Sequence, residues 1–275
     1  MYYDPVKDIF ASLIRRFTFL RIFFYKLLNL FFLRTWYVKR ELKNIRKKFG
    51  SREINIFDAG TGYGQYTYFM TRHLQPNKIY AVDVKEDWIK DNKEFFKNRT
   101  ENVTFGIEDL TSINYIEKFD LIVCVDVMEH IEDDITVFKN FYNALKKGGY
   151  VLINTPSVYG GSDVHGDEES FIGEHARTGY SDIDLKDKLS KAGFNEFYFK
   201  YSYGFWGDKA WRLAIKYPML LLNISKIFFL VLPVYFLITF PFALLMMLLD
   251  YNLKNKTGTG ITYVAGINEF NQIRS

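Results

Sequence analysis

The chain has 275 residues, a formal net charge of +4 and a single cysteine, Cys124. This length accommodates one large α/β domain with additions, and the charge is too small to indicate a nucleic-acid partner. One cysteine forms no internal disulfide, which suits a reducing compartment. Aromatic residues make up 19% of the chain and are concentrated toward its two ends.

Residues 8–48 contain no proline or glycine and combine phenylalanine with basic residues, which predicts a helix. The longest charge-free run, residues 27–33, is far shorter than the roughly 20 residues of a membrane-spanning helix. We interpret the segment as an amphipathic helix at a membrane interface, with Arg21, Lys26 and Arg34 among the basic residues that reach anionic headgroups. The alternative is a helix that covers the neighbouring domain, with its aromatic side chains in the core.

Residues 54–66 read as a short apolar strand, a glycine-rich turn and the start of a helix. Gly60, Gly62 and Gly64 let the main chain adopt unusual angles or approach a ligand, and a helix N-terminus favours a polar or anionic ligand. Asp58 stands just before the turn. The G-x-G-x-G spacing differs from the G-x-G-x-x-G of dinucleotide-binding enzymes, which weakens a dehydrogenase interpretation. The alternative is an ordinary tight turn between a strand and a helix.

Four further strands are predicted, and acidic residues stand at the ends of three of them. The strands are residues 79–83, 103–107, 119–125 and 149–154. The acids are Asp83, Glu108, Asp109 and Asp126. Continuous apolar strands are typical of a parallel sheet that is buried on both faces. Because ligands bind such sheets at the carboxyl ends of the strands, we expect the acids around one cleft with Asp58.

Five segments in this order and spacing resemble a class I S-adenosylmethionine-dependent methyltransferase, in particular the small-molecule O-methyltransferases of the ubiquinone pathway. They are FDAGTGYG, YAVDV, FGIEDL, FDLIVCVDVMEHI and LKKGGYVLINTPS. The resemblance covers about residues 50–204 and 258–270. It implies a Rossmann-like α/β fold with a seven-stranded sheet in the order 3-2-1-4-5-7-6, whose last strand is antiparallel. It also implies S-adenosylmethionine as the cofactor.

The same resemblance implies which residues surround the cofactor. They are Asp58, Ala59, Gly60, Thr61, Gly62, Gly64, Asp83, Val84, Glu108, Asp109 and Asp126. Asp58 and the glycines are expected to hold the methionine part, and Asp83 the ribose hydroxyls. Asp109 is expected to bind the adenine amine, with Glu108 as the alternative.

Glu129 and His130 directly follow the fourth strand, so we expect them to face the methyl donor. A histidine can act as a general base near neutral pH. In some proteins with this pair it lies at the acceptor, and in many others it is architectural. Residues 156–181 form a glycine-containing loop, a type that often acts as a lid, and His175 within it is another candidate base.

A metal site is the alternative use of the same loop. Its candidate ligands are Asp163, His165, Glu174 and His175. Their spacing matches no recognised ligand pattern, so we expect no metal.

Strands at residues 195–203 and 260–267 would ordinarily be joined by a short hairpin, but more than fifty residues separate them. Within this insertion, residues 227–249 carry no charge and are long enough to span a membrane. A single span would place the last strand across the membrane from its partner, and Pro233 and Pro241 are expected to interrupt the helix.

The consistent solution is a re-entrant or interfacial helical hairpin, with residues 209–232 as its first arm. The alternative is a buried cap or a dimer interface, because so large an apolar surface needs a partner.

Three regions are therefore expected: a basic N-terminal helix in residues 1–50, a methyltransferase domain in 51–204 and 258–275, and an apolar hairpin in 205–257. We expect methyl transfer to a lipophilic, membrane-derived small molecule, by O-methylation of a phenol or hydroxyl, on the cytoplasmic side of the membrane as a monotopic or peripheral protein. The alternatives are N-methylation of a lipid headgroup or amine, and a non-catalytic cofactor-binding protein at the membrane. The sequence specifies neither the acceptor nor the oligomeric state.

Overall fold

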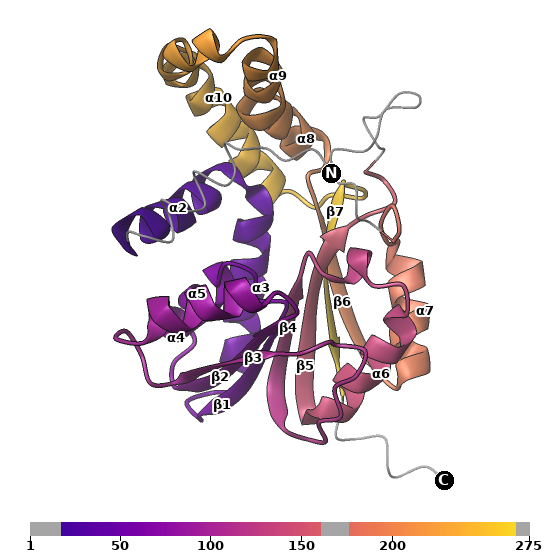
Figure 1. Cartoon of the computed structure of the whole chain (residues 1–275). Helices are drawn as coiled ribbons and strands as arrows, with labels where there is room; N and C mark the ends of the chain where they lie inside the picture. Colours follow the sequence, from indigo (N-terminus) through magenta and orange to yellow (C-terminus); the bar gives the residue numbers. More distant parts are fainter. Residues whose placement is uncertain (1–17, 161–175, 268–275) are drawn as a thin grey trace.

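The computed structural model describes residues 18–160 and 176–267, and its centre is one seven-stranded sheet (Figure 1). The strands are β1 (Ile54–Ala59), β2 (Asn77–Asp83), β3 (Val103–Ile107), β4 (Phe119–Val125), β5 (Leu145–Pro156), β6 (Glu196–Ser202) and β7 (Gly260–Gly266). Their spatial order is β3-β2-β1-β4-β5-β7-β6, with β1 to β5 parallel and β7 antiparallel to both its neighbours. The predicted Rossmann-like sheet, including its antiparallel last strand, is confirmed.

Helices cover both faces of this sheet. One face carries α4 (Gln65–His73) and α5 (Glu86–Phe96), and the other carries α6 (Asp134–Ala144) and α7 (Asp182–Ala192). Every residue of β4 is buried. Leu121 and Val123 pack in the layer with α4, whereas Ile122 and Cys124 pack in the layer with α6 and α7. Successive strand residues point to opposite faces, so a strand covered on both sides is apolar throughout.

Residues 18–48 form two helices, α2 (Thr18–Phe31) and α3 (Leu33–Lys48), rather than the single helix that the composition of residues 8–48 predicted. The break is at Phe32, whose backbone is extended with φ −109° and ψ 107°. The two helices pack on different partners: α3 contributes Val38 and Leu42 to the core beneath the sheet, whereas α2 places Tyr25 against α5. The chain must turn between them to bury both faces, although no glycine or proline marks the turn.

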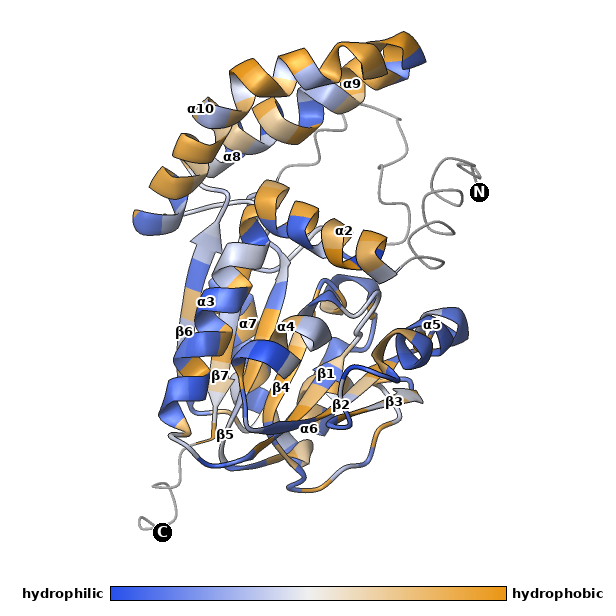
Figure 2. Cartoon of the chain, turned by 90° about the vertical axis from the view of Figure 1, so that its left-hand side faces the viewer, coloured by the Kyte–Doolittle hydropathy of each residue, from blue (hydrophilic) through white to orange (hydrophobic). Residues whose placement is uncertain are grey.

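The insertion between β6 and β7 forms a helical hairpin, as predicted. Its elements are α8 (Phe205–Trp211), the π-helix η2 (Arg212–Lys216), α9 (Tyr217–Ile224), the 3-10 helix η3 (Lys226–Leu230) and α10 (Leu232–Asn252). α8 packs along α10, and the hairpin projects from one end of the sheet (Figures 1 and 2). β6 and β7 are neighbours, so the chain leaves the domain and returns to it on the same side.

The expectation that prolines interrupt the apolar segment is confirmed at Pro233 and wrong at Pro241. The helix is broken between η3 and α10, and Pro233 lies in the first turn of α10, where its missing N–H is not needed. α10 then continues through Pro241. By length and composition α10 is able to cross a membrane: its most apolar window has a mean hydropathy of 2.2, and 11% of that window is buried. α10 is therefore not a core helix of the described chain.

Candidate active site

The turn between β1 and α4 is built on glycines at positive φ. Gly60 and Gly64 have φ angles of +86° and +73°. A Cβ atom at Gly60 would lie 2.2 Å from Cγ2 of Val127, and one at Gly64 would lie 2.6 Å from Oδ1 of Asn92. Neither position can take a side chain without rearrangement. At Gly62, by contrast, the nearest atom would be a Trp88 ring carbon at 3.7 Å.

Asp83 connects the end of β2 to this turn. Its Oδ2 accepts a hydrogen bond from the N–H of Gly62 at 2.9 Å, and its Oδ1 accepts one from the N–H of Lys85 at 3.0 Å. Thr61 donates its own N–H to the Val82 carbonyl at 2.8 Å. The turn and the carboxyl end of β2 are thus one hydrogen-bonded unit.

Asp58 lies beneath the turn and is 4% exposed. Its carboxylate accepts a hydrogen bond from the Thr67 hydroxyl, and that hydroxyl lies 2.7 Å from the hydroxyl of Thr61. Burial raises the pKa of Asp58 to about 6. Ala59 is fully buried, and Val84, at the outer end of β2, is 63% exposed. Asp58 therefore ties the end of β1 to α4 from inside the protein.

The two acids after β3 have different surroundings. Glu108 accepts hydrogen bonds from the hydroxyls of Tyr80 and Tyr115, and its Oε2 is buried without a partner among the described residues. Asp109 is exposed and accepts hydrogen bonds from the N–H and hydroxyl of Thr111 at 2.9 and 2.8 Å. Of these two acids, Glu108 therefore has the carboxylate oxygen that can still accept a hydrogen bond at the end of β3.

The end of β4 carries an ion pair that the sequence did not predict. Asp126 has a φ of +54°, rare for a residue with a side chain, and its carboxylate pairs with Nη1 of Arg34. Arg34 lies in the first turn of α3, and its Nε is buried without a hydrogen-bond partner in the described part of the chain. The expectation that this arginine reaches lipid headgroups is therefore wrong. The available signal was a lone charge within the apolar run FFLRTWY.

Two tyrosines complete the surroundings of this pair. The hydroxyl of Tyr203, at the end of β6, accepts a hydrogen bond from the N–H of Arg34 at 3.2 Å. The hydroxyl of Tyr66, in α4, is buried, and no residue in 18–160 or 176–267 bonds to it. Burial raises the pKa of Tyr66, which also lies within electrostatic range of Arg34, Asp126 and Tyr203. Charged and phenolic groups from four elements therefore converge above the glycine turn.

The predicted Glu129–His130 pair is divided between the interior and the surface. Both lie in the 3-10 helix η1 (Met128–His130), but Glu129 is 2% exposed whereas His130 is exposed. The Thr155 hydroxyl donates to Oε2 of Glu129 at 3.1 Å. Burial, with the charge of Asp126, raises the pKa of Glu129 to about 8. The carboxyl group is therefore the buried, proton-holding member of the pair.

His175 and the alternative metal ligands lie outside the described residues. Within the described ranges, no group of three or more acidic, histidine or cysteine residues is placed to hold a metal ion. The segment after the loop supports η1: Ala176 donates its N–H to the Glu129 carbonyl at 2.9 Å, and Arg177 pairs with Asp134.

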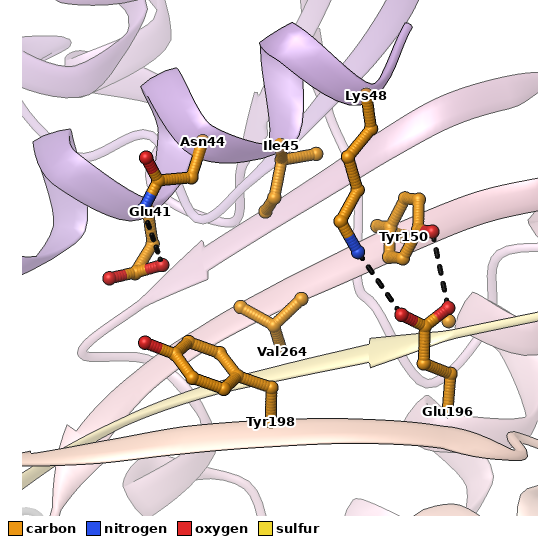
Figure 3. A pocket seen from close by; sticks show the side chains of 9 residues that line it. Glu41, Asn44, Ile45, Lys48, Tyr150, Glu196, Tyr198 and Val264 are labelled. Carbon is orange, nitrogen blue, oxygen red and sulfur yellow. Dashed lines mark hydrogen bonds and ion pairs between the residues drawn. The ribbon is translucent and has the colours of Figure 1, made fainter.

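A separate hollow of 310 Å³ lies between α3 and strands β5, β7 and β6 (Figure 3). Its polar side chains pair with one another: Glu196 accepts from Lys48 and from Tyr150, both at 3.1 Å. Tyr150 begins the paired part of β5 next to β4, so the hollow lies toward the opposite strand ends from the glycine turn. It is not part of the candidate active site.

Comparison with known proteins agrees with this geometry. A family model described as a methyltransferase domain matches residues 51–189. A phosphoethanolamine N-methyltransferase from Triticum aestivum is 29% identical over 145 residues, 51% of this chain and 28% of that protein. A ubiquinone biosynthesis O-methyltransferase from Coxiella burnetii is 24% identical over 115 residues, 42% of this chain and 48% of that protein. The matched region is thus less than half of either relative.

Solved structures share the fold. Haemonchus contortus phosphoethanolamine N-methyltransferase 2, in complex with phosphomonomethylethanolamine and S-adenosylhomocysteine, superimposes with a TM-score of 0.57 at 18% identity, covering 84% of this chain and 53% of that one. The [4+2]-cyclase SpnF superimposes with a TM-score of 0.55 at 16% identity, covering 84% and 81%. Since the fold is common to different reactions, the family assignment rests on the sequence match over residues 51–189. The chain belongs to the methyltransferase domain family.

Proposed function

We propose that this protein transfers a methyl group from S-adenosylmethionine to a lipophilic small molecule drawn from a membrane. The observation that carries the proposal is the single unit formed by the glycine turn and Asp83, next to the Arg34–Asp126 pair and Glu129. Membership of the methyltransferase domain family supports the reaction, and the complexes of the Haemonchus contortus enzyme support the cofactor.

The described residues fit this cofactor. The turn leaves open main chain at Gly62, Asp83 suits the ribose hydroxyls, and Glu108 or Asp109 suits the adenine amine. Arg34, with a spare donor at Nε, suits the methionine carboxylate. When bound, S-adenosylmethionine supplies an electrophilic methyl group on a sulfonium. The protein then has to align the acceptor with that group and exclude water.

Within this reaction we favour O-methylation of a phenol or hydroxyl. Such an acceptor must lose a proton, and a buried carboxyl whose pKa is about 8 is matched to that task near neutral pH. We therefore assign the base to Glu129, with His130 and His175 as the other candidates. N-methylation of an amine is the second candidate, because the carboxyls of Asp126 and Glu129 lie close enough to interact and would stabilise an ammonium group.

The lipophilic acceptor is inferred from the hairpin. α8 begins two residues after Tyr203, which contacts Arg34, so the hairpin starts at the rim of the site. Its long helix α10 is apolar and little buried. We propose that the hairpin lies in the cytoplasmic face of a membrane as a monotopic anchor, with the anionic leaflet attracting the basic N-terminal region.

Methylation of lipid extracts tests the proposal directly. Purified full-length protein is incubated with radiolabelled S-adenosylmethionine and fractionated membrane lipids, beside Glu129→Gln. Label in one lipid fraction, lost in the variant, is the expected result. Cofactor binding without any labelled lipid would contradict the lipophilic acceptor. Absence of cofactor binding would overturn the proposed methyl transfer itself.

A further inference from the structure

Helix α2 holds the glycine turn from the outside. Arg21 is 4% exposed and donates from Nη2 to the Tyr63 carbonyl at 2.6 Å, between the second and third glycines of the turn. The hydroxyl of Tyr25, one helical turn later, donates to the same carbonyl. The guanidinium of Arg21 also lies over the Phe95 ring, 4.3 Å from its centroid. The expectation that Arg21 reaches lipid headgroups is therefore wrong.

These contacts extend to the cofactor-facing groups through Asn92 of α5. Arg21 donates to Oδ1 of Asn92, and Nδ2 of Asn92 donates to the Gly62 carbonyl at 2.8 Å. The N–H of Gly62 in turn binds Asp83 at 2.9 Å. A displacement of α2 would therefore release the Tyr63 carbonyl and free the Asn92 side chain that holds the Gly62 carbonyl, next to the N–H that binds Asp83.

The opposite face of α2 is apolar and open. Phe19, Phe23 and Leu30 are 67%, 54% and 39% exposed, and they share one helical face with exposed Lys26. One short helix thus has a charged residue buried against the protein and phenylalanines directed outward, the reverse of an ordinary surface helix.

Helix α2 also contacts the hairpin. The ring centroid of Phe31, at the end of α2, lies 5.4 and 5.2 Å from those of Phe236 and Phe240 in α10. Figure 2 shows that α10 is apolar along most of its length. Its large exposed apolar side chains are Val234, Leu237, Ile238, Phe242, Leu245 and Leu248.

We infer that the outer face of α2 binds an anionic lipid bilayer together with α10, and that this contact strengthens cofactor binding by holding α2 on the glycine turn. A bilayer suits a 21-residue helix with a mean hydropathy of 2.2 that is 11% buried. Anionic headgroups suit Lys26, which is exposed on the same face of α2 as Phe19 and Phe23. The inference rests on the proposed cofactor site and adds to it a control by the membrane.

By thermodynamic linkage, the membrane and the cofactor must increase each other's affinity by the same factor. The dissociation constant of S-adenosylmethionine is measured by equilibrium dialysis with full-length protein, in buffer and with vesicles of phosphatidylcholine containing about 30% phosphatidylglycerol. We expect binding to be roughly fivefold tighter or more with vesicles. The triple variant Phe19→Gln, Phe23→Gln, Leu30→Gln should bind the cofactor normally in buffer and lose this gain.

The matched control is the pair Ile116→Gln and Ile183→Gln. Both isoleucines are at least as exposed, at 80% and 75%, but lie in other parts of the domain, so the gain should persist. Equal cofactor affinity with and without vesicles would overturn the inference and leave the proposed function standing. An affinity that rises with protein concentration but not with vesicles would also overturn it, by indicating a second copy on this face. Failure to bind the cofactor in any condition would overturn both.

Discussion

The carboxyl edge of the sheet and the α8–α10 hairpin differ in which side chains they keep inside the protein and which they expose. At the sheet edge, charged groups are paired or buried within the chain: Arg34 pairs with Asp126, and Glu129 retains its proton because burial raises its pKa. On the hairpin, large apolar side chains face outward, with Leu230 and Leu237 each 79% exposed. The first region pairs its charges within the chain and keeps the Nε of Arg34 spare, whereas the second exposes an apolar surface of the kind that marks a membrane or protein contact.

The two regions meet at one buried carboxylate, which shows how they are connected. Asp250, near the end of α10, is fully buried and accepts hydrogen bonds from the Tyr37 hydroxyl at 2.9 Å and from the N–H of Gly207 at 3.0 Å. These partners belong to α3 and α8. The hairpin is therefore fixed to the same helix that carries Arg34 into the site.

Removing the hairpin is the strongest test of the difference between the two regions. Ser202 and Gly260 are paired on adjacent strands, so a short Gly-Ser turn can replace residues 205–257 without disturbing the sheet. We expect the shortened protein to leave the membrane fraction while binding S-adenosylmethionine in buffer within a few-fold of the full chain. Sedimentation with membranes and dialysis measure the two effects.

A milder variant avoids exposing the surface of the domain that the hairpin covers. It is the triple variant Leu237→Gln, Phe242→Gln, Leu245→Gln, which keeps the helix and changes only exposed positions. It should also weaken membrane association. Membrane partitioning that is unchanged in both proteins would contradict the bilayer-bound hairpin and favour a dimer interface.

Substitution of Glu129 is expected to give the next largest effect, which is on the rate of methyl transfer. The pKa of its carboxyl rises from 4.5 to about 8 in the folded chain through burial and the charge of Asp126. Methyl transfer should therefore increase as the pH rises toward 8, and Glu129→Gln should lower the rate about 100-fold or more. A wild-type rate that rises near pH 6.5, the ordinary pKa of histidine, with normal activity in the variant, would assign the base to an imidazole.

The same group predicts how stability changes with pH. Between 4.5 and about 8 the folded state binds more protons at Glu129 than the unfolded state does. Ionisation therefore costs stability, and the free energy of unfolding falls by at most about 1.4 kcal/mol per pH unit as the pH rises across this window. In urea titrations without cofactor, Glu129→Gln should become progressively more stable relative to the wild type over the same window. A difference in the free energy of unfolding that does not change with pH would mean that the Glu129 carboxyl is exposed to water.

Much of the fold was predictable because the strands carry their own local signals. Five apolar segments with acids or glycines at their ends fixed the parallel strands, and the unusual length between residues 203 and 260 located the hairpin. The boundaries were less certain where tertiary contacts decide them. β5 extends to Leu145–Pro156 by pairing with β4 at its start and with β7 at its end, and α10 passes through Pro241 although the sequence marks a break there.

The site was predictable only where it lies on those strands. Arg21 and Arg34 resemble interfacial arginines in sequence, and their contacts within the protein depend on the break at Phe32, which no proline or glycine marks. Glu129 and His130 are adjacent in sequence, so only the turn of η1 decides which of them is buried. The local sequence pattern indicates which functional residue types lie along a strand or helix. The packing between these elements decides which charged side chains come into contact.

The smallest expected effect, and the most specific test, concerns the hydrogen bonds of Asp250. Asp250→Leu leaves the Gly207 N–H buried without an acceptor and leaves the Tyr37 hydroxyl only the main-chain carbonyl of residue 250, so we expect a loss of about 1–3 kcal/mol in the free energy of unfolding. Adding Tyr37→Phe removes the hydroxyl that donates to the Asp250 carboxylate. Because each single variant already loses this hydrogen bond, the double variant should be less destabilised than the sum of the two single variants, which a denaturant double-mutant cycle measures. Strict additivity would mean that the hydrogen bond between Tyr37 and the Asp250 carboxylate does not contribute to holding the hairpin on α3.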